Sequence, residues 1–159
     1  MRVRDLKTAE LERYLKGEKD ILALYLFGSH SEGVAHTRSD VDLAILLGPK
    51  VDGDRYIECR LRYLSELKGF VPGTLDLVVL NQVPPLLQFQ ILQKGKLVFD
   101  RDSDARAEIE MKMLGQCYLA ARFYEFQFSY LIQRIKKDGL GRGFQSYRSP
   151  IEEIRRVLQ

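Results

Sequence analysis

Two short apolar runs, separated by a polar stretch rich in glycine and serine, constrain this chain more than any other feature. Residues 21–27 and 41–47 consist mainly of Ile, Leu, Val and aromatic side chains, and such runs between turn residues are typical of buried strands. Gly28 follows the first run directly, and Asp40 and Asp42 open the second. Because side chains alternate along a strand, the two carboxylates face the same side, about 7 Å apart. This pair is suited to hold one divalent ion or two.

Helical and strand patterns alternate along the rest of the chain. Hydrophobic spacing, glycines and prolines predict further strands and a set of helices. The predicted strands cover residues 74–80 and 96–99, and the predicted helices cover residues 8–16, 54–67, 84–94 and 102–137. In the helix over 54–67, Ile57, Leu61 and Leu64 are expected to form the apolar side. The order of elements predicts an α/β (α+β) fold, in which helices flank a small mixed sheet of about four strands.

The last long helix, over residues 102–137, carries apolar side chains on more than one face. One stripe includes Ile109, Met113 and Cys117, whereas the aromatic residues between Tyr118 and Tyr130 spread over other faces. A helix of this kind is either sandwiched between layers or exposed for a partner. Both interpretations stay open on different faces. Beyond it, residues 149–152 predict a capped start of a further short helix.

Composition limits the class of protein. The 159 residues suit one domain with a helical appendage, and an apolar fraction of 45% suffices for a core. The net charge of +3 is mild and does not by itself indicate nucleic acid as a ligand. No apolar run approaches the ~18 residues of a membrane span, so a soluble cytoplasmic protein is expected. Cys59 and Cys117 lack the spacing of a metal site and are expected to be buried free thiols.

Asp76 adds a third carboxylate, inside the predicted strand over 74–80. A charge within an apolar strand is costly unless it is paired, exposed or bound to metal. Asp76 is therefore either a sheet-edge residue facing water or a neighbour of Asp40 and Asp42. Three carboxylates would suit Mg²⁺, and two ions ~3.5–4 Å apart clamp the attacking and leaving oxygens of a phosphoryl displacement. Asp76 is also a candidate to deprotonate an attacking hydroxyl.

Gly28 and Ser29 complete the predicted site. Glycine lets a ligand approach the backbone, amides at the start of a following helix favour phosphate oxygens, and the Ser29 hydroxyl adds a donor. Ser39 either caps its turn or donates to a phosphate. His36 and Arg38 lie in the same loop and either contact phosphates or are solvated.

The segment GSHSEGVAHTRSDVDLAIL resembles the signature of the minimal nucleotidyltransferases of the DNA polymerase beta superfamily. Their pattern is Gly-Ser, ten residues, Asp-x-Asp and a later Asp on another strand, and the resemblance covers about residues 10–100. It implies a polymerase beta palm-like fold, ATP as substrate and one or two Mg²⁺ ions. The nucleotide-binding residues that it implies are Gly28, Ser29 and Ser39. The catalytic and metal-binding residues that it implies are Asp40, Asp42 and Asp76.

A small catalytic domain followed by a long helical segment is similar to the antitoxins of MntA–HepT toxin–antitoxin pairs. This resemblance implies a catalytic domain over 1–101 and a helical segment over 102–159 that packs on it, contacts a partner, or both. It also implies a type VII antitoxin that transfers AMP to a tyrosine of its cognate HEPN-fold ribonuclease toxin.

Two other functions remain open on the sequence. One is nucleotidyl transfer to a small molecule, as in antibiotic-modifying enzymes. The other is a non-catalytic antitoxin that acts by docking its aromatic helix. Neither a membrane nor nucleic acid is expected as a direct ligand, whereas homo- and hetero-oligomers are both compatible with the sequence.

Overall fold

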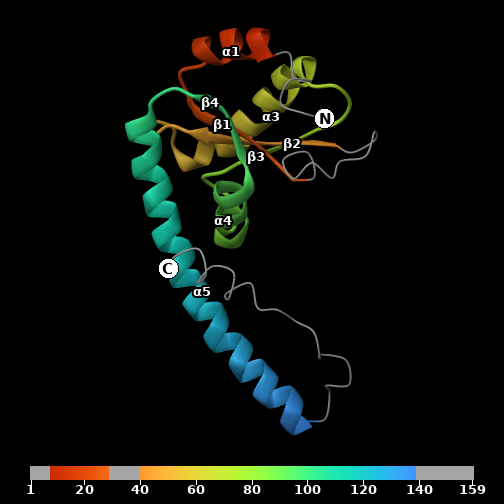
Figure 1. Cartoon of the computed structure of the whole chain (residues 1–159), viewed down its shortest axis with the longest axis vertical. Coiled ribbons are helices and arrows are strands. Elements are labelled where there is room, and N and C mark those ends of the chain that lie inside the picture. Colours follow the sequence, from red (N-terminus) through yellow and green to blue (C-terminus); the bar gives the residue numbers. More distant parts are fainter. Residues whose placement is uncertain (1–7, 29–39, 139–159) are drawn as a thin grey trace.

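Four strands form one mixed sheet in the computed structural model, which describes residues 8–28 and 40–138 (Figure 1). The strand order is β3-β2-β1-β4. Strand β1 is antiparallel to both β2 and β4, whereas β2 and β3 are parallel. The strands are β1 (Ile21–Phe27), β2 (Val41–Leu47), β3 (Leu75–Val79) and β4 (Lys96–Asp100). The mixed sheet of four strands expected from the sequence is confirmed.

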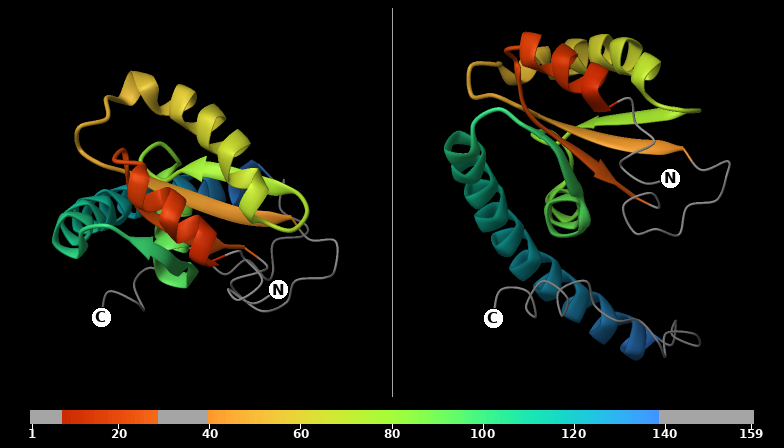
Figure 2. Two further views of the ribbon diagram at one scale, coloured as in Figure 1. Left: turned by 90° about the horizontal axis from the view of Figure 1, so that it is seen from above. Right: turned by 45° about the horizontal axis from the view of Figure 1, so that its top comes forward.

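Helices cover both faces of this sheet (Figure 2). Helices α1 and α3 pack on one face, and α4 together with the first half of α5 packs on the other. The helices are α1 (Thr8–Gly17), α3 (Tyr56–Leu67), α4 (Pro85–Lys94) and α5 (Ser103–Asp138), with single 3-10 turns η2 (Gly53–Arg55) and η3 (Lys68–Phe70) at the ends of α3. Because both faces are covered, the central strands are apolar almost throughout.

Side chains of the central strands alternate between two hydrophobic clusters. Leu24 and Ile45 point toward α1 and α3, whereas Tyr25 and Ala44 point toward α4 and α5. The runs that the sequence identified as strands thus contribute to both clusters, together with helix residues. The even-numbered residues of β2, Asp42 included, share the α4–α5 face.

The buried side of α3 differs from the expected one. Ile57 and Leu61 are 63% and 60% exposed, whereas Cys59, Tyr63 and Leu67 are buried. The predicted apolar side is therefore wrong for Ile57 and Leu61, whereas Leu64 is partly buried against the core, as expected. Tyr63 can be buried because its hydroxyl is paired with the Glu18 carboxylate, 3.1 Å away, which satisfies the polar atom in the core.

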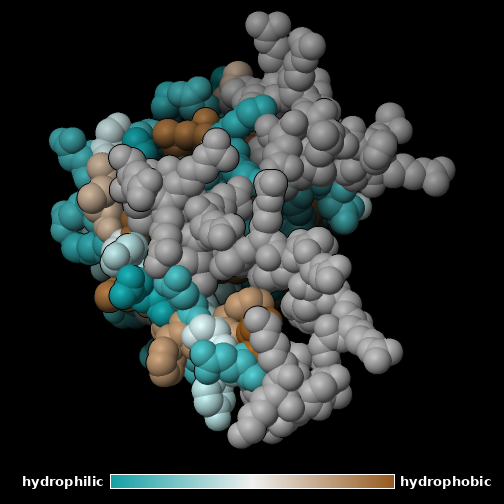
Figure 3. Space-filling view, turned by 60° about the horizontal axis from the view of Figure 1, so that its bottom comes forward, coloured by the Kyte–Doolittle hydropathy of each residue, from teal (hydrophilic) through white to brown (hydrophobic). Residues whose placement is uncertain are grey.

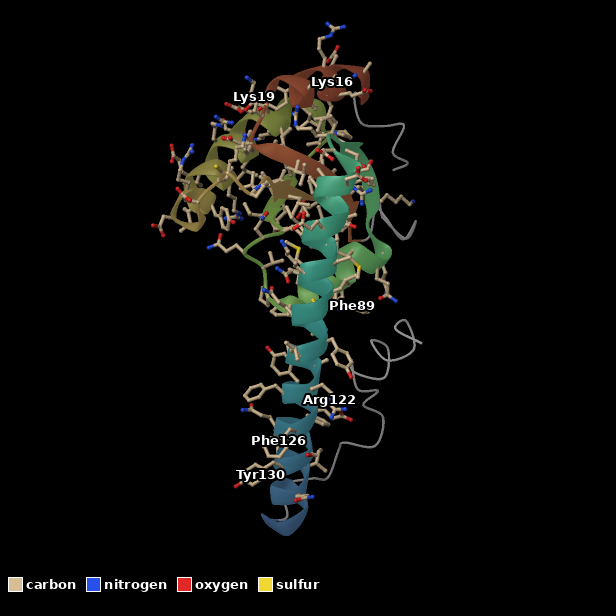
Figure 4. The ribbon with its side chains drawn as sticks, turned by 90° about the vertical axis from the view of Figure 1, so that its left-hand side faces the viewer. Lys16, Lys19, Phe89, Arg122, Phe126 and Tyr130 are labelled. Carbon is tan, nitrogen blue, oxygen red and sulfur yellow. The ribbon has the colours of Figure 1, made fainter. Side chains whose placement is uncertain are left out.

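Helix α5 has 36 residues and is therefore about 54 Å long. Met113, Cys117 and Ala121 are buried on one stripe, and Cys117 and Ala121 cluster with Phe89 of α4 (Figure 4). Past Ala121 the helix leaves the sheet, and large apolar side chains are exposed among hydrophilic ones (Figure 3). They include Phe123, Tyr124, Phe126, Tyr130 and Leu131. Helix α5 therefore has both a packed stripe and an exposed apolar surface.

A polar network anchors the start of α5 to the sheet. The Tyr25 hydroxyl of β1 donates to the Glu110 carboxylate, and the Arg106 guanidinium lies 2.8 Å from Glu110 Oε1 and 3.0 Å from Asp100 Oδ2. Burial and the bond to Glu110 raise the pKa of the Tyr25 hydroxyl above its usual value. The network ties α5 to β1 and β4 by charge as well as by packing.

The two cysteines are buried free thiols, as the sequence predicts. Burial raises the pKa of both thiols above its usual value, which keeps them protonated and unreactive. No helix among the described residues is long and apolar enough to cross a membrane. The predicted helix start at residues 149–152 lies outside the described residues.

Candidate active site

The end of β1 lies against the start of β2. Phe27 pairs with Asp42 in the antiparallel register, and Gly28 follows with a φ of +68°, a conformation that side chains with a Cβ rarely adopt. A Cβ atom built on Gly28 would lie 2.2 Å from Asp42 Oδ2. The glycine therefore serves two needs at once, the left-handed turn and the close approach of backbone to carboxylate.

Asp42 and Asp76 are direct neighbours in the sheet. They are register partners in the parallel pair of β2 and β3, where adjacent strands are roughly 4.8 Å apart. Leu43 and Leu77, one residue later in each strand, are buried in the cluster under α1 and α3. The two carboxylates consequently point to the opposite face, where Asp42 is half-buried and the Asp76 side chain is 57% exposed.

The structure supports the first interpretation of Asp76 and, for Asp42 alone, the second. Strand β3 is the last in the order of the sheet, so Asp76 is an edge residue that faces water, and it also lies beside Asp42. Asp40 precedes β2 directly and is exposed. Among residues 8–28 and 40–138, no three Asp, Glu, His or Cys side chains are grouped closely enough to hold a metal ion. The sheet thus unites Gly28, Asp42 and Asp76, and a site of all three carboxylates stays a prediction.

Several predicted site residues lie outside the part of the chain that the structure describes. They are Ser29, His36, Arg38 and Ser39. Their roles in phosphate binding stay predictions.

Arg60 of α3 is a site residue that the sequence interpretation missed. Its Nη2 lies 3.7 Å from Asp76 Oδ1, and its Nε donates to the carbonyl oxygen of Leu77 at 2.6 Å. The sequence carries no signal for this contact, since it depends on how α3 is rotated about its axis over β3. Arg60 places a positive charge beside the Asp76 carboxylate.

The arrangement fits a divalent cation. Two carboxylates lie side by side on one face of the sheet and reach solvent, and such hard oxygen ligands suit Mg²⁺, which also keeps waters and substrate phosphates as ligands. Next to them, Gly28 presents backbone without a side chain. Binding of a phosphate at Gly28 stays a prediction.

A family model described as "Polymerase beta, Nucleotidyltransferase" matches residues 9–104 of the chain. A curated relative, the protein adenylyltransferase MntA of Shewanella oneidensis, is 31% identical over 81 residues, or 51% of this chain and 55% of the relative. The chain thus spans about half the length of the curated relative that it matches.

Solved structures with a similar fold include two toxin–antitoxin structures. A chain of a toxin–antitoxin structure with AMP-PNP aligns with a TM-score of 0.53 at 24% identity, covering 86% of this chain and 100% of that chain. A chain of a mutant toxin–antitoxin that contains MntA aligns with a TM-score of 0.52 at 22% identity, with the same two coverages. At these identities the likeness establishes the fold.

Proposed function

Because the chain belongs to the polymerase beta nucleotidyltransferase family, we propose that it is a protein adenylyltransferase that acts as a type VII antitoxin. It transfers AMP from ATP to a tyrosine of a cognate HEPN-fold, HepT-like ribonuclease toxin and thereby inactivates the toxin. Two findings support this proposal: a relative is named a protein adenylyltransferase, and toxin–antitoxin structures share the fold, one of them with AMP-PNP. We place the reaction in the cytoplasm, where ATP is available.

One observation carries the chemical part of the proposal. Gly28 directly follows β1, whereas Asp42 and Asp76 lie in β2 and β3. Gly28 lies against the Asp42 carboxylate, and Asp76 is in register with Asp42. The nearby Asp40 precedes β2 directly and joins them as the third carboxylate of the proposed site.

The proposed site residues have three roles: metal binding, phosphate binding and proton acceptance. Asp40, Asp42 and Asp76 would hold one or two Mg²⁺ ions, and such ions would offset the charge of the triphosphate. Gly28, Ser29 and Ser39 bind the phosphates through backbone and hydroxyl groups. The tyrosine oxygen forms a bond to the α-phosphorus, the bond from that phosphorus to pyrophosphate breaks, and Asp76 accepts the tyrosine proton.

The two parts of the chain have separate roles in this proposal. We assign the catalytic domain to residues 1–101 and a C-terminal segment to residues 102–159, in which the first part of α5 packs on the catalytic domain. The exposed apolar surface of α5 past Ala121 contacts the toxin. Aromatic side chains are enriched in protein interfaces, and Phe126 and Tyr130 are 72% and 65% exposed.

Mass spectrometry of the toxin tests the proposal. With ATP, Mg²⁺ and the full-length chain, the toxin should gain one or more AMP groups on tyrosine. Asp42→Asn and Asp76→Asn should abolish the adduct, while Asp54→Asn, an exposed aspartate in η2, should not. An undiminished adduct with Asp40→Ala and Asp42→Ala combined would refute the site.

The same variants separate the alternative functions. If the Asp42→Asn protein still neutralises the toxin in cells, neutralisation occurs by docking rather than by transfer. If the wild-type protein modifies a small-molecule acceptor and leaves the toxin unmodified, the antibiotic-type activity is correct instead.

A further inference from the structure

Arg60 reaches from α3 across the sheet edge to the acidic pair. Strand β3 is the outermost strand next to β2, and the carbonyl oxygen of Leu77 accepts a hydrogen bond from Arg60 Nε at 2.6 Å. The same guanidinium extends Nη2 to within 3.7 Å of Asp76 Oδ1. One rigid planar group thus contacts both the strand backbone and the carboxylate.

Stability explains this ion pair poorly. The Arg60 and Asp76 side chains are 44% and 57% exposed, and ion pairs so exposed to water contribute about 0–1 kcal/mol to folding. The neighbouring Arg55–Glu58 pair is similar, with a separation of 3.8 Å and side chains 52% and 75% exposed. What sets Arg60 apart is its location, since Asp76 is the register partner of Asp42.

Two like charges side by side on adjacent strands repel each other. A cation at the outer side of Asp76 offsets that repulsion and draws one carboxylate oxygen toward the edge of the sheet. The bond from Nε to the strand backbone fixes the guanidinium, so the position of the cation does not depend on the carboxylate alone. A lysine has one ammonium group on a flexible stem and does not reproduce this double contact.

We propose that Arg60 is a positioning residue that orients Asp76 beside Asp42 for binding a divalent cation. The inference rests on the function proposed above, because it assigns the metal role to Asp76. Arg60 acts through Asp76 and has no assigned contact with the substrate.

Binding of Mn²⁺, followed by electron paramagnetic resonance on the full chain without ATP or toxin, tests this inference. Arg60→Gln should weaken Mn²⁺ binding about 10-fold, as the loss of a partner to a metal ligand commonly does. Arg60→Lys, which keeps the charge, should recover only part of the loss. Arg55→Gln, which removes a similarly exposed ion pair of the same region, should bind as the wild type does.

A double mutant distinguishes positioning from a general effect of charge. Arg60→Gln combined with Asp76→Asn should bind Mn²⁺ no more weakly than Asp76→Asn alone, because the two residues act through one contact. Melting temperatures of Arg60→Gln and Arg55→Gln should agree within a few degrees, in keeping with exposed pairs.

Three results would overturn the inference: wild-type affinity in both Arg60 variants, an equal loss in Arg55→Gln, or no Mn²⁺ binding by the wild type. If Arg60→Gln is poorly folded, the Mn²⁺ affinity of Arg60→Lys tests the inference instead, and wild-type affinity in that variant would overturn it. A chain that binds Mn²⁺ in this Arg60-dependent way but adds no AMP to the toxin would refute the transfer function and leave the role of Arg60 intact.

Discussion

Gly28→Ala tests the close approach between the β1 turn and the Asp42 carboxylate. An alanine Cβ would lie 2.2 Å from Asp42 Oδ2 and 2.9 Å from its Cγ. To regain an ordinary contact, the carboxylate has to move by about 1 Å, since atoms of this kind pack at roughly 3.5 Å. The substitution also forces a residue with a Cβ into a φ of +68°, which costs about 1–2 kcal/mol.

Gly73→Ala is a matched control. Gly73 has a φ of +87°, and a Cβ built on it would meet nothing within 4 Å. Gly73→Ala should therefore destabilise the fold only through its unfavourable φ, by about 1–2 kcal/mol. This change lowers the melting temperature by roughly 2–8 °C for a domain of this size. Gly28→Ala should destabilise the fold by a similar amount and should in addition displace the Asp42 carboxylate.

The two variants should separate in activity. A displacement of about 1 Å in a reacting group reduces rates by about 100-fold, so Gly28→Ala should slow AMP transfer by about that factor, while Gly73→Ala should stay near the wild type. Initial rates of adduct formation, measured well below both melting temperatures, provide the comparison. A Gly28→Ala protein within threefold of the wild-type rate, or an equal loss in Gly73→Ala, would refute the reasoning.

Further predictions concern stability and the α5 surface. Because burial raises the pKa of Tyr14, Tyr25 and Tyr63 in the folded state, the unfolded state loses these three protons first. Stability should be retained below pH 10 and fall by up to about 4 kcal/mol per pH unit above it, as urea titrations between pH 8 and 11 would measure. Arg106→Met leaves the Glu110 and Asp100 carboxylates of the network without their cation and should cost about 1–3 kcal/mol in the same assay. Phe126→Ser, at a position 72% exposed, should change stability by less than about 0.5 kcal/mol but weaken toxin binding measured by calorimetry.

The strands were predictable because their signal is local. The runs at residues 21–27 and 41–47 are β1 and β2, with the same limits. Alternation along these runs also assigned Asp42 to one face of the sheet, as observed. The parallel partner of β2 was not predictable, because it depends on how the connection through α3 crosses the sheet.

The sequence did not predict correctly which side of α3 is buried, and the reason is physical. The helix carries two apolar stripes, one through Ile57 and Leu61 and one through Cys59 and Tyr63, so hydrophobic spacing alone does not choose between them. Tertiary contacts determine which stripe is buried, and one of them is the hydrogen bond from the Tyr63 hydroxyl to Glu18, which follows α1. The same rotation of α3 places Arg60 next to β3. The contact between Arg60 and Asp76 is therefore not predictable from the sequence.

The site was predictable in its outline and not in its detail. Gly28, Asp42 and Asp76 are candidates from the combined spacing of Gly-Ser, ten residues, Asp-x-Asp and a later Asp in another strand. The structure places Gly28 and Asp76 next to Asp42, and their roles stay predictions. The sequence did not reveal how closely Gly28 approaches Asp42, since this distance follows from the antiparallel register of β1 and β2. Spacing also gives the face of a side chain but not its rotamer, so it does not decide whether Asp40 joins the other two carboxylates.

Helix α5 connects the site to the surface where we place the partner. Its first turns are held to β1 by the Tyr25–Glu110–Arg106 network, and Tyr25 lies three residues before Gly28. Past Ala121, a further 17 residues extend the helix by about 25 Å, away from the sheet (Figure 1). A protein docked there is held at a set distance and angle from Asp42. We therefore expect acceptor choice to depend on docking along α5, and substitutions such as Phe126→Ser to raise the KM for the toxin while leaving kcat near the wild-type value.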